Sequence, residues 1–214
     1  MSTKICTNKT INKKHLKLKK AYLNNIEISD KNLGDKYTKF EDSKLDESQT
    51  LLYEIKNKPK KFMRYFRGEI VRVKFGVNIG SEFSGEHFAI VISKRDTMMN
   101  PTLHVIPLTS KKHLKSVNVG NILYDENLIN GLRAKFRGEN DSKKKKEIER
   151  VIKYYTQRKN TISYACIDHI KTISKLSINK TLFEKYDYLP LLKCNNELIE
   201  KIDNCIIKEY TNLN

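Results

Sequence analysis

Apolar and polar side chains alternate through the middle of the chain in a pattern that predicts β-strands. Residues 67–75 alternate between apolar and polar, as a strand with a single buried face does. Residues 87–93 are almost wholly apolar, which is typical of a central strand covered on both faces. Further strands are predicted over residues 103–108 and 117–123. Pro107 lacks a backbone N–H, so we expect the third strand to bulge or to reach a sheet edge there.

A helical pattern precedes these strands. Residues 41–58 are predicted to form a helix that is capped by Asp42 or Ser43 and ends before Pro59. One face of this helix carries Leu45, Leu51, Leu52 and Ile55. The lysine-rich run at residues 13–20 is expected to form a short basic helix or a disordered arm.

A charged segment interrupts the strands at residues 125–160. It includes four consecutive lysines at residues 143–146, and a charged helix is predicted over residues 142–157. The lysine run is interpreted either as a solvated helix face or as an added contact to phosphate groups. Strand character returns at residues 161–167.

The end of the chain favours an amphipathic helix over residues 195–210, with Asn195 or Asn196 as its cap. Several short antiparallel strands and a terminal helix predict a small β-barrel of the α+β class. We therefore expect an extension at residues 1–60 and a barrel domain at residues 61–214 that carries the insert.

Composition adds a strongly basic character. The 214 residues include 42 lysines and arginines against 25 aspartates and glutamates, which gives a formal charge of +17. Such a surface attracts anions, of which nucleic acid is the commonest large one. A genome rich in A and T favours lysine and asparagine codons whatever the function, so the charge permits a nucleic-acid partner without establishing one.

Cysteine and histidine usage predicts a cytoplasmic protein without a metal or other cofactor. The four cysteines form no C-x-x-C pair, and the five histidines are scattered along the chain. No apolar run approaches the length of a bilayer span, and residues 1–20 lack the apolar core of a secretory signal. We therefore expect no membrane partner.

Five segments resemble, in the same order and spacing, the MazF/PemK family of toxins. They are Arg-Gly-Glu-Ile-Val at 67–71, Gly-Ser-Glu at 80–82 with Gly85, and the runs at 89–93, 106–110 and 169–175. The resemblance implies an SH3-like barrel that forms homodimers and cuts single-stranded RNA, including mRNA, without a metal. It also implies an acidic antitoxin whose tail lies across the active site.

The resemblance implies catalytic positions at His87 and Thr109. Cleavage without a metal uses the ribose 2′-OH as nucleophile, so a proton must be removed and the phosphate charge stabilised. Relatives have Arg where this chain has His87, which we assign as general acid or base. Thr109 and Ser110 are assigned as donors to the scissile phosphate. Lys111 or Lys112 is then expected to hold the phosphate charge.

Substrate contacts are expected from Ser81, Glu82 and Phe83, since the matching loop of relatives contacts RNA. Phe83 is interpreted either as a ring that stacks on a base or as an anchor of the loop. Asp168 and His169 match a base-reading Glu-Gln pair in relatives.

Two other functions remain open at this point. A protein-binding poison similar in architecture to CcdB is one alternative. CcdB-like action depends on a terminal Trp, however, and this chain has no Trp. A non-catalytic module that binds RNA or DNA is the other. The role of the helix at residues 41–58 is a further open question: covering the site and replacing part of the antitoxin contact are the two alternatives.

Overall fold

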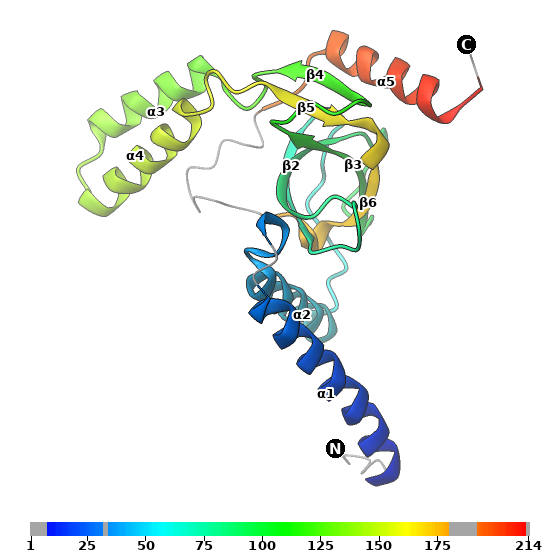
Figure 1. Ribbon diagram of the computed structural model, residues 1–214. Helices are drawn as coiled ribbons and strands as arrows, with labels where there is room; N and C mark the ends of the chain where they lie inside the picture. The colour runs from blue at the N-terminus through cyan, green and yellow to red at the C-terminus, as the bar shows by residue number, and fades with distance from the viewer. Residues whose placement is uncertain (1–7, 32–33, 180–191, 213–214) are drawn as a thin grey trace.

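The computed structural model describes residues 8–31, 34–179 and 192–212. It contains a six-stranded antiparallel sheet with helices before, within and after it (Figure 1). The predicted α+β class is therefore confirmed. None of the helices in the described ranges is long and apolar enough to cross a membrane.

The strands follow the alternating pattern closely. They are β1 (Ile70–Gly76), β2 (Gly85–Val91), β3 (Thr102–Thr109), β4 (Ser116–Gly120), β5 (Ser163–Cys166) and β6 (Lys171–Ser174). The helices are α1 (Asn8–Asp30), α2 (Phe40–Asn57), α3 (Glu126–Gly138), α4 (Ser142–Thr156) and α5 (Asn196–Tyr210), with short 3-10 turns η1 (Asp35–Tyr37), η2 (Ile167–His169) and η3 (Lys175–Ser177). β6 and α3 were not predicted from the sequence.

The first three strands and β6 close into a small barrel. β1 pairs with β2, β2 with β3, and the first half of β3 with β6. The chain after η3 then returns to β1 through a bridge between Ile178 and Val73, and the Asn179 N–H donates to the Arg72 carbonyl at 2.8 Å. The ring is closed, and its interior is filled by Tyr65, Val71, Val73, Phe75, Ala89, Val91, Leu103, Val105, Ile173 and Ile178.

The prediction for Pro107 is confirmed as a change of partner along one edge of β3. Residues up to Val105 pair with β6 on that edge, whereas Leu108 and Thr109 pair with β5. Pro107 lies in the gap between the two partners, where its missing N–H removes no bond to either of them. The second half of β3 is thereby free to lead into the β5–β4 ribbon.

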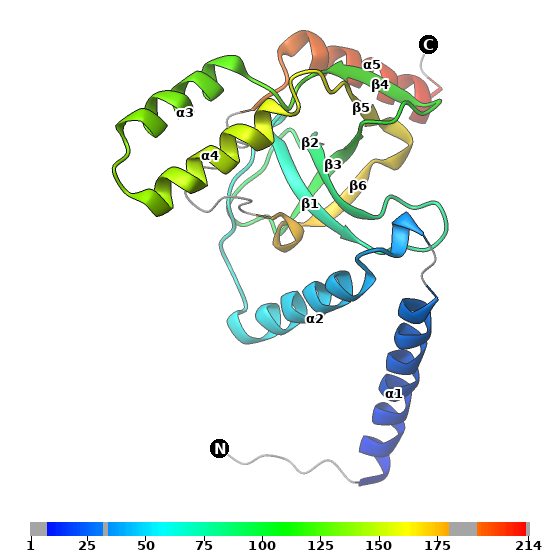
Figure 2. The same cartoon turned by 60° about the vertical axis from the view of Figure 1, so that its left-hand side comes forward.

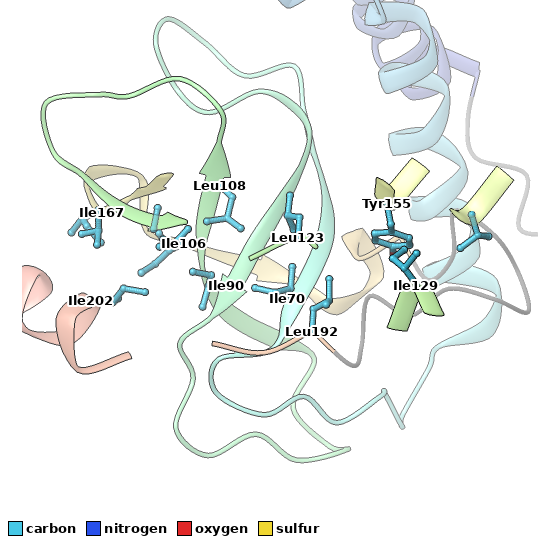
Figure 3. Close-up of a cluster of buried hydrophobic side chains, with 14 of the residues drawn as sticks. Ile70, Ile90, Ile106, Leu108, Leu123, Ile129, Tyr155, Ile167, Leu192 and Ile202 are labelled. Carbon is cyan, nitrogen blue, oxygen red and sulfur yellow. The ribbon is translucent and has the colours of Figure 1, made fainter. Parts of the chain in front are cut away.

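A second hydrophobic core covers the outer face of the sheet (Figure 3). Ile70, Ile90 and Ile106 contribute from the strands, alternating with residues of the barrel interior. Ile202 of α5 is fully buried against them, and the Asn195 side chain caps α5 by accepting from the Leu198 N–H at 2.9 Å. The predicted terminal helix and its cap are confirmed.

The insert at residues 125–160 folds as a pair of helices that joins this outer core. Ile129 and Leu132 of α3 and Ile148 and Val151 of α4 are fully buried (Figure 3 labels Ile129). The charged helix predicted at residues 142–157 is confirmed as α4. Burial of one face explains why a lysine-rich segment is ordered, since its apolar stripe has somewhere to pack.

The amino-terminal helices differ from expectation in their bounds. The basic run at residues 13–20 belongs to a much longer helix, α1. α2 begins at Phe40, so the predicted caps Asp42 and Ser43 lie inside the helix, and its Lys39 cap makes no side-chain bond. Burial of the Phe40 ring accounts for the earlier start, because it fixes the first turn against the protein.

A buried ion pair ties three segments below the barrel. Lys175 of η3 and Asp96 of the β2–β3 loop approach to 2.8 Å, with side chains almost fully buried. Lys175 also donates to the carbonyls of Met63 and Thr97, and the Tyr65 N–H donates to Asp96. The segment that leads into β1 is therefore fastened to the barrel by polar contacts.

Candidate active site at the mouth of the barrel

The loop between β1 and β2 is held in one shape by its own side chains. The Asn78 amide donates to the carbonyls of Phe75 and Phe83 at 3.0 and 2.7 Å. The Ser84 hydroxyl accepts from the Asn78 N–H and donates to the Glu82 carbonyl, each at 3.0 Å. These bonds fix the loop internally, so the residues it carries have defined positions.

His87 stands directly after this loop, near the start of β2. Gly85 has φ +91°, a conformation that favours glycine, and it turns the chain so that the His87 Nε2 lies 3.0 Å from the Ser84 carbonyl. Burial lowers the pKa of His87 below its ordinary value of 6.5. Backbone hydrogen bonds with Ser84 and Leu108 and the charge of Glu86 oppose that shift but do not cancel it. The imidazole is therefore neutral near pH 7.

Phe83 lies at the centre of a group of rings. Its centroid is 4.5 Å from that of His87, 5.5 Å from that of His169 and 5.6 Å from that of Phe75. The Phe83 ring is half-buried against the barrel interior, so it anchors the loop. This agrees with the second of the two interpretations given for Phe83 from the sequence. The same contacts bring His87 and His169, which are far apart in the sequence, to one place.

Thr109 ends β3 beside the strand that carries His87. The pairing of β2 with β3 runs from Val91 with Val105 to Ala89 with Pro107 and ends two residues short of both His87 and Thr109. Both lie on the sheet face that lines the barrel interior, because side chains two apart share a face. A hydrogen bond joins the His87 side chain to the backbone of Leu108, the residue before Thr109. It brings His87 close to the end of β3.

Lys171 joins the same mouth from β6. It pairs with Val105, so it shares the interior face of the sheet, and its Nζ lies 3.4 Å from Glu82 Oε2. The ion pair ties the β1–β2 loop to β6 and adds a cation that we had not assigned to the site. Tyr164 was also missed, and it is the cross-strand partner of Thr109 in β5. Only the pairing of distant strands reveals either residue.

The remaining candidate residues are exposed and lie on the segments that lead to or from this mouth. Asp168 is exposed on η2, with Oδ1 4.0 Å from His169 Nε2. Ser81 of the loop and the residues that follow β3 are also exposed: Ser110, Lys111 and Lys112. Among the described residues, no side-chain hydrogen bond joins Ser81, Ser110, Lys111 or Lys112 to His87. Their assigned roles remain predictions.

Titratable, hydroxyl and aromatic side chains thus collect at one end of a small closed barrel in an α+β protein. The chain belongs to the family of PemK-like, MazF-like toxins of type II toxin-antitoxin systems, whose family model matches residues 66–208. The family assignment made from the sequence is confirmed. A comparison with curated proteins found none that matches. Residues 1–65, with α1 and α2, lie outside the family match, whereas α3 and α4 lie within it.

Proposed function

We propose that this protein is an endoribonuclease that cuts single-stranded RNA by attack of the ribose 2′-OH, without a metal, and leaves a 2′,3′-cyclic phosphate. The observation that carries the proposal is the position of the His87 imidazole, half-buried against Phe83 at the mouth of the barrel and close to the end of the strand that bears Thr109. A base, a hydroxyl donor and cations at one mouth are the groups that such a cleavage needs.

His87 acts as the general base for the 2′-OH. As the 2′ oxygen bonds to phosphorus the P–O5′ bond breaks, and the departing 5′ oxygen takes a proton from solvent and leaves as a 5′-OH. The neutral form of His87 is the one able to take the 2′-OH proton, and the lowered pKa keeps that form populated at neutral pH. The hydrogen bonds with the backbone of Ser84 and Leu108 favour the protonated ring, so they stabilise the imidazolium that forms as the proton arrives.

Thr109 donates to the scissile phosphate. Its Oγ1 already accepts from the Lys111 N–H at 3.1 Å, which orients the hydroxyl and leaves its proton available to a ligand. Ser110 adds a second hydroxyl. Lys111, Lys112 and Lys171 supply the positive charge that relatives obtain from the Arg in place of His87.

The rim of the mouth contacts the bases. The exposed part of Phe83 stacks on a base, while Ser81 and Glu82 contact the neighbouring nucleotides. Asp168 and His169 read a base edge, and the ring contact with Phe83 holds His169 toward the substrate. This arrangement makes cleavage dependent on short sequences.

The partners follow from the same proposal. An acidic antitoxin covers the mouth and neutralises its lysines, and the barrel domain at residues 61–214 pairs with a second copy in the cytoplasm. The division of the chain at residue 60 remains a prediction, and it agrees with a family match that begins at residue 66.

The test is incubation of the purified full chain with a defined single-stranded RNA in EDTA. Discrete fragments with cyclic phosphate ends are expected, and they should disappear with His87→Ala. Binding of RNA without fragments would instead support a non-catalytic module. Absence of both, with growth arrest retained in cells, would support a protein-binding poison.

A further inference from the structure

α2 packs against the barrel with its polar side and leaves its apolar side in water. Four polar residues of its middle turns are partly buried: Ser43, Lys44, Asp46 and Thr50. Asp46 Oδ2 lies 2.7 Å from Lys74 Nζ of β1, which makes this contact an ion pair. On the other side of the helix, the exposed fractions of Leu45, Leu51, Leu52 and Ile55 are 56%, 52%, 53% and 67%. A helix of a compact protein normally does the reverse.

α1 carries a similar exposed stripe. Its large apolar side chains are spaced at helical intervals and are between 39% and 68% exposed: Leu16, Leu18, Tyr22, Leu23 and Ile26. Lys14 and Lys17 lie on the opposite side, Lys13 and Lys20 border the stripe beside Leu16, and Lys19 falls within it. Both helices outside the family match thus present apolar stripes that no other described element covers.

The two stripes carry opposite charge. The sequence of α1 contains six lysines and two acidic residues, a net charge of 6 − 2 = +4. The sequence of α2 contains five acidic residues and two lysines, a net charge of 2 − 5 = −3. Lys13 and Lys20 lie three before and four after Leu16, whereas Glu47 and Glu54 lie four before and three after Leu51. Basic residues therefore flank one stripe and acidic residues flank the other.

The corner between the helices directs α1 away from α2 of the same chain (Figure 2). The Ser29 hydroxyl contacts the Glu41 carboxylate across this corner. Lys36 of η1 donates to the Gly80 carbonyl of the β1–β2 loop at 2.6 Å, so the corner is also fastened to the barrel. In this arrangement the stripe of α1 is presented to another molecule rather than to its own α2.

We propose that α1 of one copy packs its apolar stripe on the α2 stripe of a second copy, and that the second copy returns the same contact. Two reciprocal α1–α2 pairs form an isologous two-fold interface. Lys13 and Lys20 of each α1 meet Glu47 and Glu54 of the opposing α2, which sets the pairing of unlike helices. The interface is independent of RNA cleavage and lies outside the family match.

The test uses chemical cross-linking between two chains that each carry one added thiol. One full-length chain carries Leu23→Cys and the other Leu52→Cys, both on a Cys6→Ser background, and a short bismaleimide joins thiols that lie close together. The mixture is expected to give a mixed dimer several-fold above that from chains with Asn24→Cys in place of Leu23→Cys. Asn24 is exposed on the basic side of the same helix and serves as the matched control.

A charge exchange checks the pairing of helices. Glu47→Lys with Glu54→Lys in the Leu52→Cys chain is expected to reduce the mixed dimer several-fold, and Lys13→Glu with Lys20→Glu in the other chain should restore it. Circular dichroism of each variant confirms that the helices remain folded. Equal yields from Leu23→Cys and Asn24→Cys would overturn the proposal. So would a link within a single chain that carries both thiols, because the two stripes would then pair in one molecule.

Discussion

The ring of Phe83 stands 4.5 Å from that of His87, centroid to centroid, with an angle of 66° between their planes. This edge-to-face contact excludes water from the imidazole, and burial is the largest cause of its lowered pKa. The loop that is expected to touch RNA therefore also sets the protonation state of the expected base. A substrate that moves Phe83 changes the imidazole at the same time.

Replacement of Phe83 by leucine should raise the pKa of His87 toward 6.5, because a smaller side chain lets water reach the ring. The imidazole resonances of His87 in an NMR titration measure this directly. Phe66→Leu is the matched control, since that ring is half-exposed and contacts Arg64 and Lys193 instead. A His87 pKa that does not change in Phe83→Leu would show that other groups desolvate the ring.

Removal of the proposed base or donor should abolish most RNA cleavage while the barrel stays folded. His87→Ala is expected to lower kcat by roughly 10²- to 10⁴-fold, the usual contribution of general base catalysis. Thr109→Val removes one donor to the phosphate, which typically costs about 10²- to 10³-fold. His104→Ala is the control, because His104 is exposed on β3 and faces away from the barrel interior. Full cleavage by both site variants would remove the assignment.

The kcat/KM of RNA cleavage should fall only at acid pH, since His87 must be neutral to act as a base. The lowered pKa places the acid limb of kcat/KM below pH 6.5. A limb above that value would mean that another group titrates. The profile is measured with a short labelled RNA at constant ionic strength, because RNA binding itself depends on salt.

The same shift makes stability depend on pH. Because the pKa of His87 is lower in the folded state, the unfolded chain binds the proton more readily between that pKa and 6.5. The contribution is complete above pH 6.5 and declines as the pH falls through this window. Urea unfolding between about pH 7.5 and 5 should show a smaller decline for His87→Gln than for the natural chain. Equal declines would contradict a buried, neutral His87.

Lys175 and Asp96 should be among the residues whose loss is most costly to the fold. Lys175→Met leaves the Asp96 carboxylate buried without its cation, which typically costs about 3–5 kcal/mol in the free energy of unfolding. The double variant with Asp96→Leu should lose less than the two single changes together, because no lone charge remains. Lys144→Met, in an exposed pair with Asp141, is the control and should have little effect on a urea melt. A small effect of Lys175→Met would mean that water reaches the pair.

Lys171 offers a test of which cation takes the role of the arginine that relatives have in place of His87. Lys171→Ala should weaken RNA binding and reduce its dependence on salt, because one phosphate contact is lost. It also frees Glu82, so Lys171→Ala with Glu82→Gln separates the charge effect from loosening of the loop. Unchanged salt dependence in both variants would assign the phosphate charge to Lys111 or Lys112.

Local patterns were enough to predict most of the elements. Alternation gave β1, β2 and β3 to within a few residues, and helical spacing gave α2, α4 and α5. α3 was not predicted although Asp125 caps it, because Gly131 in its middle weakens the helical pattern. β6 was missed because a four-residue strand has too few alternations to stand out.

The residues of the candidate site also fall into two groups, those that a local motif indicates and those that only strand pairing brings to the site. The motif around residues 80–87 and the end of the third strand pointed to His87 and Thr109 from the sequence alone. Lys171 and Tyr164 were not found, since nothing in their neighbourhood along the chain marks them. Their place at the mouth depends on which strands pair, and strand pairing joins residues more than fifty positions apart.

The order of residue types along the chain determined the class of fold, the family and the two positions expected to carry the chemistry. Periodicity and motif spacing are local properties, so they can be read without knowing what packs against what. Tertiary structure alone decided that Phe83 shields His87, that Lys171 reaches the loop, and that α2 turns its leucines outward. Each of these depends on how distant segments pack together. The free energy of such packing depends on how much surface is buried, which cannot be predicted from a short stretch of sequence.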